Sequence, residues 1–347
     1  MALFDTIRAG SSGAVDYEIE RSARFNNSDS AYFLRTSVSS PTNVKIWTMS
    51  LWIKRDAVVN GEDMEILFGN DYVTSGISTR GFQFAVNHSS GINDMQLDAF
   101  DGASGNQIAR SDGKYRDPTA WMHLVVRCDT TQGTQSNRLR FYVNGVDIEV
   151  SNNLSQNQEL TWNKGGRDQY LGCHSVNGTP QRFYRGYMAE VHFIDGQSKD
   201  PSHFAETDST TGFYKPIKYQ GTYGNNGWFM AFTDNSNTTA TTFGKDYSGN
   251  GNNMTPFGFS VSSGVGNDSV FDTPTNNFAT FNSLDKNGNV NTANGNMQTN
   301  STTGGNHFPI FTTQSMKGGK FYMEYRLLNN DNGVIFSIMN IEHDAGS

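Results

Sequence analysis

The chain has 347 residues, a formal charge of −8 and 17% charged side chains, with no run of basic residues. Phosphate binding needs clustered Lys and Arg, so this charge balance argues against a nucleic acid partner. No apolar stretch approaches the roughly 18 residues that span a membrane, so membrane insertion is not expected. The 24 Phe, 14 Tyr and 5 Trp still supply enough apolar surface for a buried core.

The first 20 residues form a predicted N-terminal docking arm. Its apolar residues are Leu3, Phe4 and Ile7, and a flexible Gly-Ser-Ser-Gly break follows at residues 10–13. A short apolar arm before such a hinge favours docking on another subunit; a frayed end or a strand tucked under the next domain is the alternative. No charged segment followed by an apolar one marks a secretory signal peptide, so we expect synthesis in the cytosol.

Closely spaced strands are predicted from residue 21 to residue 207. Apolar and polar residues alternate within them, and Asn144-Gly145 predicts a type I′ hairpin turn, because both residues tolerate positive φ. Many short strands with turns between them are typical of an antiparallel sandwich. Besides the hairpins of residues 121–150, we expect strands at residues 22–25, 31–34, 47–53, 65–68, 81–86, 95–100, 170–173 and 186–193.

The composition changes over residues 208–310, where we predict a loop-rich connector with short strands. From Gly221 to Ile310, 18 of 90 residues are Asn and Glu is absent. Asn side chains compete for backbone hydrogen bonds, which disfavours long elements. One strand is expected at residues 227–232, and the connector is expected to lie on a neighbouring part of the protein. Strands return after residue 311, where a second, partial β region needs further strands to bury a core.

Four pieces of the region 21–207 follow a known order: the strand 47–53, Trp121-x-His123 before an apolar run, Tyr142-Val-Asn-Gly, and residues 185–204. This order resembles the laminin-G-like, concanavalin-A-like lectin superfamily. The resemblance implies an all-β fold, a concanavalin-A-like antiparallel β-sandwich (jelly roll). It also favours a binding or structural module over an enzyme.

The wider layout resembles virion proteins of tailed bacteriophages, particularly those of marine bacteria. The segments that carry this resemblance are residues 1–14, 22–34, 245–253 and 272–277, together with residues 318–340, which are similar to the start of a SPRY-like domain. It implies a virion structural protein, a tail fibre, spike or other surface-displayed fibre, assembled in the host cytoplasm and used for host attachment. Its implied partners are other virion proteins, a host surface glycan and further copies of this chain. The alternatives are a head decoration or cement protein, or a carbohydrate-binding or carbohydrate-processing module.

Catalysis is not predicted. Glycoside hydrolases on this fold place two carboxylates about 5 Å apart, and Asp63 and Glu65 would share one strand face. The hydrolase pattern requires a further acid on that face, where this chain has Leu67 and Phe68. We therefore interpret the pair as a polar strand edge.

The histidines and cysteines are predicted to be structural. The seven His lack the spacing of a zinc site, and His123 alternates with Trp121 and Val125, which predicts a hydrogen-bonded histidine within a sheet. Cys128 and Cys173 are expected to be small buried apolar residues. A disulfide between them stays open, because spacing alone does not test it.

No cofactor is required by the sequence, and calcium is the ion that the resemblance implies. Asn70-Asp71 or residues 98–106 would supply oxygen ligands, although Asp-Gly turns also form without metal. For a glycan, Tyr72, Trp162 and Tyr184 lie in loop-like context and are the candidates for stacking on a sugar ring. The alternative for these aromatic residues is the core.

Overall fold

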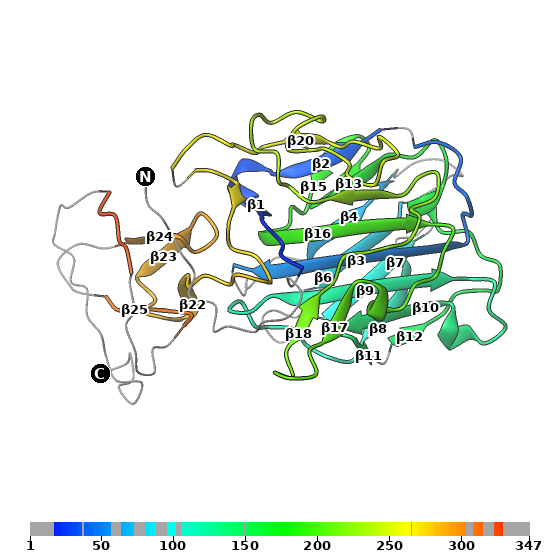
Figure 1. The fold of residues 1–347 in the computed structure, drawn as a ribbon, viewed down its shortest axis with the longest axis horizontal. Helices are drawn as coiled ribbons and strands as arrows, with labels where there is room; N and C mark the ends of the chain where they lie inside the picture. Colours follow the sequence, from blue (N-terminus) through cyan, green and yellow to red (C-terminus); the bar gives the residue numbers. More distant parts are fainter. Residues whose placement is uncertain are drawn as a thin grey trace.

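The computed structural model describes residues 17–36, 38–56, 64–72, 81–87, 96–101, 106–148, 150–264, 266–302, 308–314 and 323–328. Two eight-stranded sheets pack face to face in an all-β sandwich, as predicted (Figure 1). Helical structure in these residues is limited to short 3-10 turns, which are η1 (Asn27–Asp29), η3 (Gln135–Asn137), η4 (Thr161–Asn163) and η5 (Pro201–His203). In this part of the chain no helix has the length and apolar character needed to cross a membrane.

The first sheet contains the longest strands of the molecule. Its order is β11 (Val146–Ile148), β10 (Leu139–Val143), β9 (Met122–Asp129), β3 (Ile46–Arg55), β16 (Gly186–Asp195), β1 (Ser22–Phe25) and β21 (Ser269–Val270), with β19 (Trp228–Met230) paired to β16.

The second sheet lies on the other side of the core. Its order is β12 (Val150–Asn152), β8 (Asn106–Ser111), β7 (Gln96–Asp101), β6 (Gln83–Asn87), β4 (Met64–Gly69), β13 (Gln169–Leu171), β2 (Tyr32–Arg35) and β20 (Thr255–Phe257).

Smaller sheets complete the structure. They are β15 (Thr179–Gln181) with β14 (His174–Val176) and β5 (Asp71–Tyr72), β17 (Ala205–Thr207) with β18 (Tyr214–Pro216), β22 (Phe281–Lys286) with β25 (Ile310–Thr312), and β23 (Val290–Ala293) with β24 (Gln298–Ser301).

Both faces of the central strand β3 are buried, for different reasons. Trp47, Met49, Leu51 and Ile53 point into the space between the two sheets and belong to the main core. The residues between them point to the outer face, where Trp52 packs in a second apolar cluster with Ile19, Trp121, Tyr187, Ala189 and Ala205. The chain on either side of β17 and β18 therefore covers this outer face.

The predicted hairpin turn at the end of β10 is confirmed. Asn144 has φ 49° and Gly145 has φ 78°, the positive values that a type I′ turn requires. The backbone N–H of His123 also donates a hydrogen bond of 2.8 Å to the Asn144 side chain. Asn144 thus supports both the turn and the neighbouring strand.

The predicted end of the sandwich at residue 207 is wrong. β19 pairs with β16, β20 pairs with β2 and β21 pairs with β1, so the segment expected to be a connector supplies strands to both sheets. Its Asn-rich composition allows only strands of two or three residues, and their partners lie far away in the sequence. The expectation that this segment lies on a neighbouring part of the protein agrees with these pairings.

The last described residues form two small hairpins beside the sandwich. The orange strands β22 to β24 lie at one end of the two large sheets (Figure 1). The Tyr187 hydroxyl donates to the backbone oxygen of Gly295, which ties the β23–β24 turn to the sandwich. Of the predicted SPRY-like strands, residues 323–328 form no strand and residues 329–347 lie outside the described residues.

Candidate functional site

Four aromatic side chains lie together on the outer face of the second sheet, and we call them the aromatic platform. Phe33 and Leu171 point into the main core, so their neighbours Tyr32 and Tyr170 point the other way, because successive side chains of a strand alternate. Tyr32 pairs with Phe257 across β2 and β20. The platform consists of Tyr32, Tyr170, Phe183 and Phe257.

The rings of the platform are ordered by contact with Tyr32. The rings of Tyr32 and Phe257 stack with centroids 4.8 Å apart and planes 10° apart. Tyr170 and Phe183 each lie 6.0 Å from Tyr32. Phe257 is 41% exposed and Tyr32 is half-buried, so the stack presents apolar ring surface to solvent.

A buried histidine lies beside the platform. Gly69 pairs with Tyr170, and a Cβ placed on Gly69 would lie 3.2 Å from the Cβ of His174. His174 is only 3% exposed, and neither of its ring nitrogens has a hydrogen-bond partner. Burial, with a contribution from the Arg182 charge, lowers the pKa of His174 to about 4. At neutral pH it is therefore an uncharged imidazole with an unused donor and an unused acceptor, a costly state inside a protein.

Two of the three predicted glycan-binding residues are not on the surface, and this correction has a clear packing reason. Trp162 is 0% exposed, because η4 inserts its ring between Phe68 and Phe193 in the core. Tyr184 is also 0% exposed, and its hydroxyl donates to the backbone oxygen of Lys54 over 3.1 Å. Tyr72 lies in β5, but its side chain is outside the described residues, as are Leu3, Phe4 and Ile7 of the arm.

The sequence carried a partial signal for the platform. Alternation in the strand predicted at residues 31–34 puts Phe33 on one face and Tyr32 on the other. Phe257 gave no such signal, since it stands in the Asn-rich segment and its partner strand is more than 200 residues earlier.

The candidate acidic pair is not an accessible catalytic pair. Glu65 is fully buried, with Arg55 at 3.1 Å and Arg185 at 2.9 Å from its carboxylate oxygens, while Asp63 lies outside the described residues. Burial, and next the charge of Glu65, raise the pKa of the nearby Asp56 to about 7. These groups form a buried ionic cluster between β3 and β4 at one end of the sandwich.

The carboxylates considered for calcium already have protein partners. Asp98 accepts bonds of 2.9 and 2.7 Å from the Arg110 guanidinium, and Asp101 accepts one of 2.5 Å from the Thr161 hydroxyl. Asp71 accepts from the Ser175 hydroxyl and from the backbone N–H of Gly178. In the ranges that the structure describes, no three His, Cys, Asp or Glu residues are grouped as a metal site.

The predictions for His123 and the cysteines are confirmed. His123 is buried, with Nε2 2.8 Å from the Ser50 hydroxyl and Nδ1 2.9 Å from the Tyr214 hydroxyl. Cys128 and Cys173 are free and buried, and burial raises the pKa of both thiols. These groups are therefore parts of the packed structure.

Solved structures share the architecture at low sequence identity. A heptameric SAP-like pentraxin from Limulus polyphemus is 15% identical over 53% of this chain and 79% of its own, with a TM-score of 0.37. Domain 4 of an extracellular arabinanase from Geobacillus stearothermophilus, in complex with arabinotriose, is 18% identical over 56% and 79%, with a TM-score of 0.31. Domains LG4-5 of the mouse laminin α1 chain are 11% identical over 61% and 48%, with a TM-score of 0.35.

Sequence comparison points to the same architecture. The search of curated proteins gives no match. Residues 26–200, half of the chain, match the Laminin_G_3 family. This chain therefore belongs to the concanavalin A-like lectin/glucanases superfamily.

Proposed function

We propose that this protein is a virion surface protein of a tailed bacteriophage, whose lectin-like sandwich binds a glycan on the host cell. The observation that carries the binding part is the aromatic platform, an exposed ring stack on the outer face of the second sheet. The protein acts as a binder in this proposal and not as an enzyme.

The platform has the chemistry that a sugar ring needs. One face of a pyranose is lined by C–H groups, which pack against the apolar face of an aromatic ring. Stacking of Tyr32 on Phe257 fixes the ring plane before any ligand arrives, so little side-chain freedom is lost on binding. The hydroxyl of Tyr32, at the half-buried end of the stack, offers a donor and an acceptor to sugar hydroxyls.

The virion part of the proposal rests on the sequence. The arm of residues 1–20 and the segments 22–34, 245–253 and 272–277 resemble proteins of phage particles. Residues 245–253 and 272–277 pack against the sandwich, as in the hydrogen bond of 2.7 Å between Arg35 and Asn252. One rigid unit of this kind suits a protein displayed on a particle exterior.

Glycan binding is tested with the full-length protein on an array of bacterial surface glycans. Phe257→Ala and Tyr32→Ala should each lose most of the binding, because each removes one partner of the stack. Phe213→Ala is the matched control, since Phe213 is an aromatic residue that is 74% exposed outside the platform. Unchanged binding in both platform variants would refute the site, and hydrolysis of a bound glycan would refute the non-enzymatic role.

Assembly into a particle is tested by deleting residues 2–14. The deleted chain should fold and bind glycan as before but be missing from purified virions, because it lacks Leu3, Phe4 and Ile7. A density map of the particle then separates the two virion roles. A position on the tail supports host attachment, and a position between capsomers supports the alternative of a head decoration protein.

A further inference from the structure

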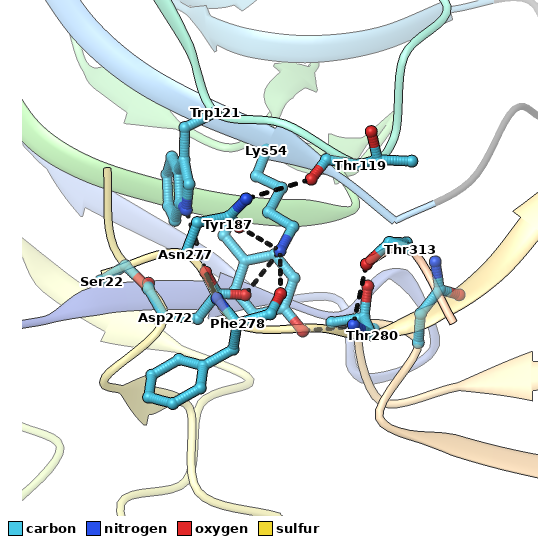
Figure 2. Close-up of polar contacts among 12 residues, drawn as sticks. Ser22, Lys54, Thr119, Trp121, Tyr187, Asp272, Asn277, Phe278, Thr280 and Thr313 are labelled. Carbon is cyan, nitrogen blue, oxygen red and sulfur yellow. Dashed lines mark hydrogen bonds and ion pairs between the residues drawn. The ribbon is translucent and has the colours of Figure 1, made fainter. Parts of the chain in front are cut away.

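The side chain of Lys54 is fully buried at one end of the sandwich and contacts three acceptors from a segment more than 200 residues away. Its Nζ lies 2.8 Å from Asp272 Oδ2, 2.8 Å from Asn277 Oδ1 and 3.0 Å from the backbone oxygen of Phe278 (Figure 2). The side-chain exposure of Lys54 is 0%, and that of Asp272 is 6%. An amine, a carboxamide and a carboxyl group thus meet in one place largely shielded from water.

The surrounding groups hold this arrangement in position. The indole Nε1 of Trp121 donates to Asp272 Oδ1 over 2.9 Å, which leaves Oδ2 for Lys54. The Ser22 hydroxyl donates to the backbone oxygen of Asp272 over 2.6 Å. Asn277 Nδ2 donates to the backbone oxygen of Thr119 over 3.4 Å, so the amide oxygen faces Lys54. Figure 2 shows the Asp272 and Asn277 side chains converging on Nζ beneath the Trp121 ring.

We propose that Lys54 and Asn277 join in an intramolecular isopeptide bond, with Asp272 as the group that transfers the protons. This inference does not rest on the proposed glycan binding. It assigns a covalent modification to a cluster whose geometry places nucleophile, electrophile and proton carrier within hydrogen-bond distance of each other.

The reaction needs no other reagent. Asp272 accepts a proton from the Lys54 ammonium, because burial disfavours the separated charges relative to the neutral amine and acid. The amine lone pair then forms the Nζ–Cγ bond with Asn277, and the Cγ–Nδ2 bond breaks. Of the three ammonium protons, one stays on the new amide and two pass through Asp272 to the departing nitrogen. That nitrogen leaves as ammonium, and Asp272 ends in its starting form.

Two features of the fold favour this chemistry. The sandwich holds the reacting groups together without diffusion, and such positioning gives effective concentrations far above those in free solution. Asn277 is exposed as a residue although its amide oxygen faces the buried amine, so ammonium has a way out to solvent. The bond would close the chain between β3 and the segment that follows β21.

The test is the mass of the intact, denatured full-length protein. The expected mass is lower than the sequence mass by one ammonia, and digestion should yield a branched peptide joining Lys54 to Asn277. Asn-Gly pairs such as Asn144-Gly145 also lose ammonia when they form succinimides. The branched peptide therefore decides, not the mass loss alone.

Four variants make the test specific. Lys54→Arg keeps the positive charge but should abolish the branched peptide, and so should Asn277→Ala. Asp272→Asn keeps the shape of the proton carrier and should leave most of the chain unlinked. Asn276→Ala is the matched control, because it changes the adjacent asparagine and should form the link as the parent does.

Each other outcome overturns the inference. A parent protein without the branched peptide shows that the cluster is only an ion pair. Loss of water, with a branched peptide at Asp272, shows a different bond. Full linkage in the Asp272→Asn variant shows that Asp272 does not carry the protons.

Discussion

The indole Nε1 of Trp121 donates a hydrogen bond of 2.9 Å to Oδ1 of Asp272, 151 residues further along the chain. Trp121 precedes the central strand β9, and Asp272 belongs to the Asn-rich segment that follows the predicted sandwich. Close by, Arg24 and Asp268 form an ion pair of 2.9 Å, which links β1 to the same segment. The Asn-rich segment is thus attached to the sandwich by buried polar contacts as well as by strand pairing.

Removing the Trp121 hydrogen bond should destabilise the protein. Trp121→Phe keeps an aromatic ring in the cluster but leaves Asp272 without one of its donors. A hydrogen bond to a charged group contributes about 1.5–3 kcal/mol, so the free energy of unfolding should fall by about that amount. Urea denaturation of parent and variant measures the difference.

Trp52→Phe is the control for this experiment. Trp52 lies in the same apolar cluster, but its Nε1 has no hydrogen-bond partner. It therefore reports the cost of exchanging the ring without the cost of a lost hydrogen bond. Equal losses in the two variants would show that the contact with Asp272 contributes nothing.

His123 should make the protein less stable in mild acid. Burial, with a smaller contribution from His192, lowers the pKa of His123 from 6.5 to about 3. The unfolded chain takes up a proton near pH 6.5 that the folded chain refuses, so stability is full above that pH and falls as the pH drops towards 3. The slope from one such group is at most about 1.4 kcal/mol per pH unit.

The matched variants are His123→Gln and His203→Gln. The first should flatten the fall in unfolding free energy between pH 6.5 and pH 4, relative to the parent. The second changes an exposed histidine and should leave the slope unchanged. An unaltered slope in both would mean that His123 is not the group that resists protonation.

Asp56 should act in the opposite direction. Burial and the Glu65 charge raise the pKa of Asp56 to about 7, so the folded protein favours the protonated acid. Its contribution to stability is present below pH 4 and is lost as the pH rises to 7. Asp56→Asn removes this loss, so the variant should gain on the parent from pH 4 to pH 7 and keep a constant advantage above pH 7. Denaturation curves across this range would contradict the prediction if the difference did not depend on pH.

The fold was predictable where the pattern is local. The strand at residues 47–53 and the turn at Asn144-Gly145 depend on neighbouring residues, and both agree with the structure. β20 and β21 were not predictable, because strands of two or three residues carry no periodicity and their partners are far away in the sequence. The boundary at residue 207 failed for this reason.

The candidate site was harder to predict than the fold. Trp162 stands among polar residues, as an exposed loop residue would, yet η4 places it in the core. The contacts of Lys54 with Asp272 and Asn277 join segments more than 200 residues apart. Neither burial in a 3-10 turn nor such a distant contact leaves a pattern in a single sequence.

Gly172 should tolerate substitution much less than Gly178, although both have positive φ, 91° and 78° respectively. A Cβ on Gly172 would lie 2.4 Å from the ring of Phe25, whereas nothing lies within 4 Å of a Cβ on Gly178. Gly178→Ala should therefore cost only the backbone strain of a left-handed residue, about 1–2 kcal/mol. Gly172→Ala should cost the same strain plus about 1–3 kcal/mol for the displaced core ring. Urea denaturation of the two variants gives the difference directly, and equal losses would mean that the core moves aside for Phe25 without cost.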